Sequence, residues 1–207
     1  MQLEAKNICF RYDKKEKLLL SKVNISCQEG ERIAILGPSG CGKSTLAKIL
    51  GGYLKPIEGQ VLLSNQPLES KGVCPVQLVY QHPEKAINPR FRMKQVLAEA
   101  RGLDPSIMTK MGIEERWLNR FPRELSGGEL QRFCVARALV PETRFLIADE
   151  MSTMLDVITQ AQLWHAILEE VKIRNMGLLV ITHNRQLAQQ ICNRVVNMTE
   201  INEDNKD

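Results

Sequence analysis

Four short apolar runs recur along the chain without alternating polar residues: Ile33–Leu36, Val76–Tyr80, Phe145–Ala148 and Leu178–Thr182. Runs of this kind are typical of strands that a parallel sheet buries on both faces. Between the runs, apolar residues return at helical spacing. Two such stripes comprise Met93, Val96, Leu97 and Ala100, and Ala161, Trp164, Ile167, Leu168 and Val171. The pattern predicts an α/β fold in which the methionine and tryptophan of these stripes belong to the core.

The first thirty residues show a different pattern. Leu3–Phe10 and Lys22–Cys27 are predicted strands, and the charged stretch Asp13–Lys17 lies between them. A charged stretch between two strands is most simply a solvated hairpin turn. We therefore expect an antiparallel β subdomain at the N-terminus.

Predicted strands disappear between Gln81 and Leu125. Pro83 and Pro89 interrupt the chain, and a helix is predicted after Asp104, which serves as its cap with the following proline at the first helical position. This segment is predicted to be a helical insertion in the α/β core.

The composition limits the classes of function. A chain of 207 residues with 43% hydrophobic residues can bury one good core. The net charge of +4 comes from scattered basic residues, so we expect no nucleic-acid partner. No apolar run approaches the roughly 18 residues that span a bilayer, and the N-terminus lacks the apolar region of a secretion signal. If the protein works at a membrane, other chains must cross it.

Cysteine spacing and the end of the chain support two further expectations. The six cysteines are widely spaced without a Cys-x-x-Cys pair, which favours free thiols in a reducing cytosol over disulfides or a zinc site. The last residues, Thr199–Asp207, are polar and acidic, and we expect a solvated tail there.

A phosphate-binding motif follows the first of the four apolar runs. Glycine backbone can turn its N–H groups inward around phosphates where a Cβ would obstruct them, and the helix after the motif directs its positive end at the anion. In this pattern Lys43 reaches the β and γ phosphates and the Ser44 hydroxyl holds Mg²⁺, so the chain is predicted to bind a nucleoside triphosphate. The predicted phosphate-binding residues are Gly37, Pro38, Ser39, Gly40, Cys41, Gly42, Lys43, Ser44 and Thr45.

Two carboxylates follow a buried strand later in the chain. Asp149 ends the run that begins at Phe145 and can hold Mg²⁺ through water, opposite Ser44. Glu150 is placed to accept a proton from a water that attacks the γ-phosphate, a role worth roughly 10²–10⁴-fold in rate. An Asp-Glu pair after a strand is often only a solvated loop, but the phosphate-binding motif in the same chain favours the catalytic interpretation.

The segment Leu125–Arg132 provides a second helix start with unfilled backbone N–H groups. Its residues Ser126, Gly127, Gly128 and Glu129 are suited to bind an anion. Since one chain seldom needs two such sites for one phosphate group, the second is predicted to serve the nucleotide of a partner. Taken alone, Ser-Gly-Gly would be better explained as an ordinary helix cap.

The order of these motifs resembles the ATPase subunit of an ATP-binding cassette (ABC) transporter. The resemblance rests on Gly37–Ser44, Gln81, Leu125–Arg132, Phe145–Glu150 and His183 and extends over nearly the whole chain. It implies that two subunits enclose two ATP molecules, each bound between the phosphate loop of one chain and the Ser126–Glu129 segment of the other.

The resemblance also implies roles for single residues. Gln81 resembles the residue that senses Mg²⁺ and the attacking water, and His183 resembles the switch histidine that contacts the γ-phosphate. Tyr12 is placed like the aromatic residue that stacks on adenine, with Phe10 as the alternative. The implied catalytic set is Glu150, His183, Gln81 and Lys43, and the implied Mg²⁺ ligands are Ser44, Gln81 and Asp149.

The resemblance further implies one domain with ABC ATPase topology. Residues 1–83 and 136–200 would form the nucleotide-binding core with its N-terminal β subdomain. Residues 84–135 would form the helical subdomain, and residues 201–207 a polar tail.

Finer similarity points to importers of peptides, nickel and metal–opine complexes. It rests on Gln81–Pro83, Ile87–Arg90, Leu155–Val157 and Gln160–Gln162. This subgroup pairs two ATPase chains, of which this one resembles the second, with two membrane permease subunits and an extracytoplasmic solute-binding protein. The segment after Gln81 would dock against a cytoplasmic helix of the permeases, which places the protein at the cytoplasmic face of the membrane.

Two departures from the subgroup pattern affect these expectations. Met151 and Met154 stand where proline and alanine are usual, although Asp156 is retained. The C-terminal extension of many peptide-importer ATPases is absent, which favours a nickel or metallophore cargo. The alternatives are a non-transport ABC ATPase, an exporter ATPase and a cassette that binds ATP without hydrolysing it. Neither the cargo nor the choice between homodimer and heterodimer follows from these residues.

Overall fold

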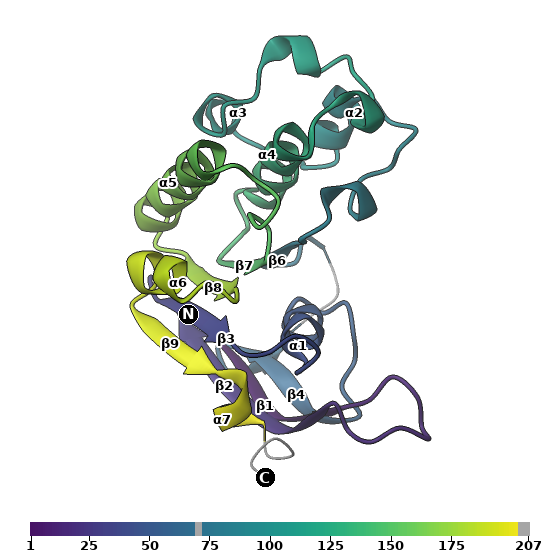
Figure 1. Cartoon of the computed structure of the whole chain (residues 1–207), viewed down its shortest axis with the longest axis vertical. Helices are drawn as coiled ribbons and strands as arrows, with labels where there is room; N and C mark the ends of the chain where they lie inside the picture. The colour runs from purple at the N-terminus through teal and green to yellow at the C-terminus, as the bar shows by residue number, and fades with distance from the viewer. Residues whose placement is uncertain (69–71, 203–207) are drawn as a thin grey trace.

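A five-stranded parallel sheet forms the centre of the computed structural model, which describes residues 1–68 and 72–202 (Figure 1). The strand order is β6-β7-β8-β3-β9, and every described pairing in this sheet is parallel. The strands are β3 (Arg32–Leu36), β6 (Val76–Val79), β7 (Phe145–Asp149), β8 (Gly177–Ile181) and β9 (Arg194–Asn197). The four predicted apolar strands are confirmed. The sequence pattern missed β9, a strand with polar residues that lies at the edge of this sheet and pairs with β3.

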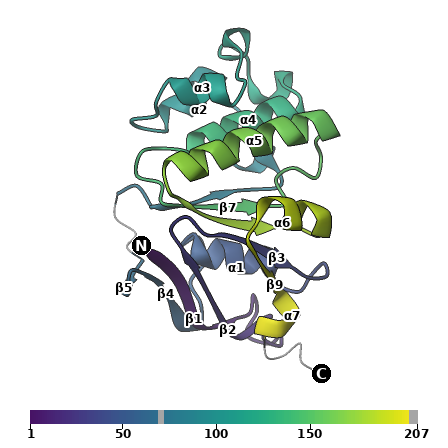
Figure 2. The same ribbon diagram turned by 90° about the vertical axis from the view of Figure 1, so that its left-hand side faces the viewer.

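Successive residues of β7 point to two separate cores, as expected for a strand buried on both faces. Phe145 and Ile147 contribute to the core shared with helix α1 (Lys43–Leu50), whereas Leu146 and Ala148 contribute to the core shared with α4 (Gly127–Ala138) and α5 (Val157–Ile173). Figure 2 shows α4 and α5 above the sheet and α1 below it.

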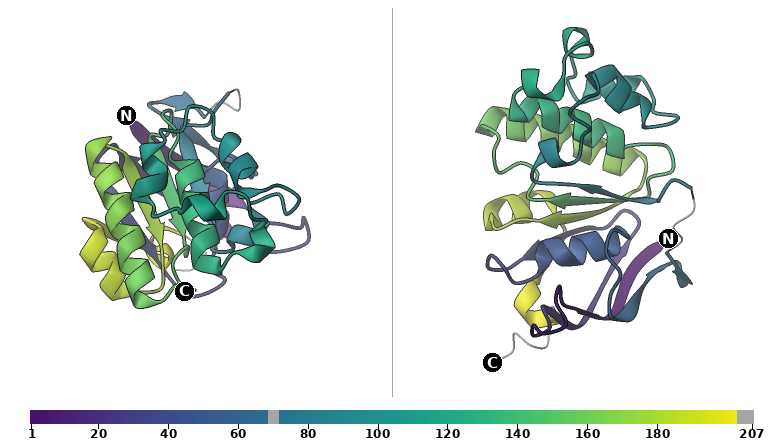
Figure 3. Two further views of the ribbon diagram at one scale, coloured as in Figure 1. Left: turned by 90° about the horizontal axis from the view of Figure 1, so that it is seen from above. Right: turned by 90° about the vertical axis from the view of Figure 1, so that its right-hand side faces the viewer.

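The predicted N-terminal β subdomain is confirmed. Its antiparallel strands have the order β2-β1-β4-β5, and the charged stretch between β1 and β2 is exposed. The strands are β1 (Gln2–Phe10), β2 (Leu20–Gln28), β4 (Glu58–Leu63) and β5 (Gln66–Pro67). Helix α1 lies between this sheet and the parallel one (Figures 2 and 3), so its apolar residues are buried from both sides.

The segment between Gln81 and Leu125 contains no strand, as predicted. Its elements are the 3₁₀ turns Pro83–Lys85, Glu115–Trp117 and Pro122–Glu124 and the helices α2 (Met93–Ala98) and α3 (Ser106–Lys110). They pack on α4, which runs unbroken past the boundary predicted between residues 135 and 136. The methionine and tryptophan of the predicted helical stripes are in the core, with Met93 fully buried and Trp164 4% exposed. In the described part of the chain, no helix has the length and apolar character needed to cross a membrane.

The expectation of a solvated tail from Thr199 onward is wrong for its first residues. Helix α6 (Arg185–Ile191) connects β8 to β9, and α7 (Met198–Ile201) follows β9. Asn202, directly after α7, is only 1% exposed. Its Oδ1 accepts a hydrogen bond from the Ser21 backbone N–H at 2.9 Å, and its Nδ2 donates to the Leu19 carbonyl at 3.0 Å. These two hydrogen bonds satisfy the polar side chain of Asn202 and allow it to be buried beside the start of β2. Residues 203–207 of the predicted tail lie outside the described residues.

Replacing Asn202 with alanine is expected to destabilise the fold by about 1–3 kcal/mol, because the Ser21 N–H and the Leu19 carbonyl would lose their partner in a buried position. Denaturant unfolding followed by circular dichroism would measure the change. The control is Asn197→Ala, which removes an exposed hydrogen bond to Glu200 and should cost no more than about 0.5 kcal/mol. Equal stability of the two variants would show that Asn202 does not anchor the end of the chain.

Candidate functional site

The phosphate loop lies at the edge of the parallel sheet where the carboxyl ends of β3, β6, β7 and β8 meet. It joins β3 to α1 through two glycines in the left-handed region, Gly40 with φ +82° and Gly42 with φ +97°. A Cβ on Gly42 would lie 2.5 Å from Cδ2 of Leu20, so only glycine fits at this position. Pro38, Ser39 and Gly40 are exposed, which leaves the outer side of the loop open to a ligand.

Lys43 is folded back into the loop rather than directed to solvent. It is 6% exposed, and its Nζ donates to the backbone carbonyls of Gly37 at 2.9 Å and Pro38 at 2.8 Å. Among the described residues no carboxylate lies within ion-pair distance of this ammonium group. Its Nζ also lies 3.9 Å from Sγ of Cys41. A buried cation beside carbonyl oxygens and a thiol is well placed to attract an anion.

Ser44 and Asp149 meet across the loop, as the motifs predicted. The Ser44 hydroxyl donates to Oδ1 of Asp149 at 3.0 Å, and Asp149 is 5% exposed. Burial raises the pKa of the Asp149 carboxyl, against the Ser44 hydrogen bond, which lowers it. A hydroxyl and a carboxylate are hard oxygen ligands, so the pair fits Mg²⁺.

The strand ends bring Glu150, His183 and Gln81 to the same turn. Oε1 of Glu150 lies 3.6 Å from Nδ1 of His183, which follows β8. Gln81, which follows β6, reaches the turn through Thr153: its Nε2 lies 3.4 Å from the Thr153 hydroxyl. The three predicted residues therefore surround one region at the sheet edge, although the chain separates them by up to about a hundred positions.

Tyr12 lies beside the start of α1. Its hydroxyl is 2.9 Å from Oγ1 of Thr45, and its ring meets Phe10 edge to face at 5.0 Å. The Tyr12 side chain is 62% exposed and Phe10 is 7% exposed. Of the two aromatic residues, Tyr12 is thus the one open to a ligand, and its stacking on adenine stays a prediction.

The segment from Ser126 to Glu129 begins α4 as an ordinary capping box. The Ser126 hydroxyl accepts from the Glu129 N–H at 3.2 Å, and the Glu129 carboxylate accepts from the Ser126 N–H at 2.7 Å. The cap interpretation is therefore confirmed, but it does not use the exposed Gly127, where an added Cβ would meet open space.

The same chain does not bring this segment to the phosphate loop. Ser126–Glu129 line a pocket of about 400 Å³ together with Met154 and Asp156, whereas Gly37 and Pro38 line a different pocket of about 340 Å³. The two pockets share no lining residue, so the Ser126–Glu129 segment and the phosphate loop of one chain face separate spaces.

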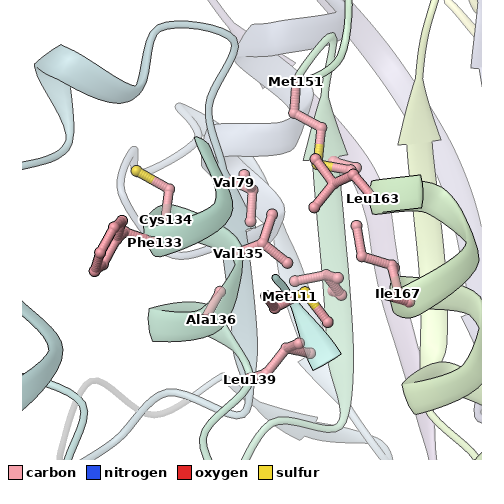
Figure 4. Packing of buried hydrophobic residues seen from close by; sticks show 14 of the residues in the cluster. Val79, Met111, Phe133, Cys134, Val135, Ala136, Leu139, Met151, Leu163 and Ile167 are labelled. Carbon is pink, nitrogen blue, oxygen red and sulfur yellow. The ribbon is translucent and has the colours of Figure 1, made fainter. Parts of the chain in front are cut away.

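The turn after Glu150 contains residues whose roles the sequence did not reveal. Met151 is 3% exposed, and Figure 4 shows its side chain in the core beside Leu163. Met154 is 65% exposed. The two methionine departures therefore differ in kind: the first fills the core, and the second changes the surface. The hydrogen bonds of Thr153 could not be recognised from sequence, because no spacing rule connects it to Gln81.

Comparison with known proteins supports the same assignment. Residues 20–153 match the family model of the ABC transporters. The chain belongs to the ABC transporter family. The nickel import system ATP-binding protein NikE of Staphylococcus aureus is 36% identical over 208 residues, which cover 94% of this chain and 85% of that protein.

Two solved structures confirm the ABC cassette fold. The dimeric structure of the bacterial ABC transporter cassette MJ0796 superposes with a TM-score of 0.80 at 25% identity, over 94% of this chain and 93% of that one. CbiO1 of Clostridium perfringens, part of the ABC transporter complex cbiONQ, superposes with a TM-score of 0.77 at 25% identity, over 94% and 83% of the two chains. The protein is thus an ABC ATPase, which binds and hydrolyses ATP.

Replacing Asp149 with asparagine is expected to stabilise this ABC ATPase when no nucleotide is present. Burial raises the pKa of the Asp149 carboxyl in the folded protein above its value in the unfolded chain. The free energy of unfolding therefore falls as the pH rises from the unfolded pKa through the folded pKa. Above the folded pKa the buried carboxylate is charged, and its full cost is present. Asparagine keeps an oxygen that can accept from Ser44 and carries no charge. Thermal unfolding should give the variant the higher midpoint at pH 7, and the difference should disappear near pH 4. A variant less stable than the wild type at pH 7 would contradict this.

Proposed function

We propose that this ABC ATPase drives the import of nickel, free or chelated, through partner membrane subunits. The observation that carries the proposal is the 36% identity with a nickel import ATP-binding protein along 94% of the chain. The similarity of Gln81–Pro83 and Ile87–Arg90 to peptide, nickel and metal–opine importers supports the same class of cargo. Non-transport and exporter ABC ATPases remain the alternatives that the experiments must exclude.

In this proposal the site hydrolyses the γ-phosphate of ATP. Lys43 and the loop N–H groups bind the phosphates, and Ser44 and Asp149 hold Mg²⁺, which withdraws charge from the phosphate oxygens when bound. Glu150 orients the attacking water and accepts its proton. His183 contacts the γ-phosphate, and its place 3.6 Å from Glu150 supports a shared role.

A second ATPase chain completes each site in this proposal. The capping box does not use Gly127, which is exposed, so the backbone N–H of Gly127 would be available to a phosphate that comes from another chain. Next to this segment, Met154, Val157 and Ile158 are 65%, 81% and 70% exposed. A group of exposed apolar side chains beside an anion-binding helix end supports a protein interface there.

The permease would dock where the chain leaves β6. A cavity of about 500 Å³ opens there, lined among others by Lys48, Tyr53, Tyr80, Lys85 and Arg137. It lies between α1 and the helical insertion, next to Gln81. A helix docked in this cavity would contact both parts of the chain and could pass movement to Gln81.

Replacing Glu150 with glutamine is expected to leave ATP binding intact and to lower hydrolysis by roughly 10²–10⁴-fold, since the amide cannot accept a proton. The ATP-bound dimer should then accumulate. Nucleotide binding, phosphate release and size-exclusion chromatography with ATP would measure the three effects. Glu142→Gln, at an exposed glutamate, is the matched control, and Lys43→Ala should instead weaken ATP binding. Rapid hydrolysis by the Glu150 variant would refute the assignment of the base.

The import proposal itself predicts which proteins accompany the chain. Purification of a tagged form from detergent-solubilised membranes should recover a second ATPase and two membrane-spanning subunits. ATP-dependent uptake of radioactive nickel into vesicles that contain this assembly would establish the cargo. Recovery with ribosomes or DNA, or transport only in the outward direction, would overturn the import proposal and leave the ATPase chemistry standing.

A further inference from the structure

The backbone of Glu150 has a conformation that its neighbours must hold in place. Its φ is +46°, in the left-handed region that a residue with a Cβ seldom adopts. The Glu150 N–H donates to the carbonyl of Ile181 at the end of β8, at 3.0 Å. This hydrogen bond holds the peptide group that joins Asp149 to Glu150. The direction of the Glu150 carboxylate then depends on what holds the next peptide group, which joins Glu150 to Met151.

Thr153 fixes that second peptide group. Its hydroxyl donates to the Glu150 carbonyl at 3.0 Å, and its backbone N–H approaches the same oxygen at 3.3 Å. A hydroxyl has one proton to donate, and its lone pairs remain free to accept. The Gln81 amide donates to it at 3.4 Å. One hydroxyl group thus connects the residue after β6 with the backbone of Glu150.

The other side of the turn is held rigidly. Ser152 is 4% exposed, and its hydroxyl accepts from Nε2 of Gln160 at 2.8 Å and from Nε1 of Trp164 at 3.0 Å. Met151 is buried in the core that Figure 4 shows. With these two residues fixed to the core and α5, the exposed side of the turn is formed by Thr153, whose hydroxyl accepts the hydrogen bond from Gln81.

We propose that Thr153 is a positioning residue: through its hydroxyl, the position of Gln81 determines the orientation of the Glu150 carboxylate. The proposal rests on the hydrolytic role proposed for Glu150. When Gln81 moves, the Thr153 hydroxyl loses or gains its second partner, and the peptide group that orients Glu150 shifts with it. In this role Thr153 acts through the backbone of Glu150 and not by binding the nucleotide or the water.

The test compares Thr153→Val with Thr153→Ser in the assembly that hydrolyses ATP, whether the chain alone or with its recovered partners. Valine keeps the shape and removes the hydroxyl, whereas serine keeps the hydroxyl. We expect kcat to fall roughly 10- to 100-fold for valine, the order of effect of a misplaced catalytic group, with KM for ATP within about twofold. Serine should restore kcat to within about threefold of the wild type. Thr109→Val, at an exposed threonine of α3, controls for the substitution itself.

A double-mutant cycle separates positioning from a general structural role. If Thr153 acts on Glu150 through Gln81, adding Gln81→Ala to Thr153→Val should lower kcat little beyond the larger single effect. If the kcat losses of the two single variants multiply in the double variant, or if Thr153→Val has the kcat of the wild type, the proposal is overturned. Thr153→Ala serves as a second variant without the hydroxyl, and thermal unfolding checks that each variant is folded. If Glu150→Gln hydrolyses ATP rapidly, the proposed function fails first; if that variant is inactive and Thr153→Val is fully active, only the role of Thr153 fails.

Discussion

Burial of the parallel sheet on both faces is the constraint on which the rest of this structure depends. Because α1 covers one face and α4 and α5 cover the other, the central strands β7 and β8 are apolar along most of their length, and the polar residues of the site lie where the strands end. Parallel strands end at one edge. The phosphate loop, the adjacent pair Asp149 and Glu150, His183 and Gln81 therefore lie at that edge, although long stretches of chain separate the four segments. The burial that stabilises the fold also assembles the site.

The same burial encloses two charged side chains, and their charges are unfavourable in the absence of a bound ligand. Lys43 is enclosed by backbone carbonyls and Asp149 is almost fully buried, with its carboxyl pKa raised by desolvation. Each group would gain a partner of opposite charge if nucleotide and a divalent cation were bound, so binding would remove a cost that folding imposes. Glu150 adds a backbone conformation in the left-handed region. Two buried charged groups and one residue with a strained backbone thus lie at the same edge of the sheet, a combination that is typical of functional sites.

Family membership and structure bear on different questions about this protein. The family comparison establishes an ABC ATPase, and the separation of Ser126–Glu129 from the phosphate loop is consistent with a site that two chains complete. Within the chain, the contacts around Thr153 connect the segment after β6 with the turn after β7. A signal that arrives beside the helical insertion therefore has a short physical route to the carboxylate of Glu150.

Local chemistry explains what the sequence predicted well. The doubly buried strands, the hairpin and the contact between Ser44 and Asp149 follow from apolar runs and from motifs of fixed spacing, and the structure confirms them. The edge strand β9 and the buried place of Asn202 could not be predicted, because a mixed or polar segment is stabilised there by partners far along the chain. The same holds for the division of roles between Met151 and Met154 and for the hydrogen bonds of Thr153. Sequence alone determined which residues are the candidates for the chemistry, since that prediction depends on residue type and short spacing. Only the tertiary structure decided which of them touch, because those contacts join strand ends that long stretches of chain keep apart.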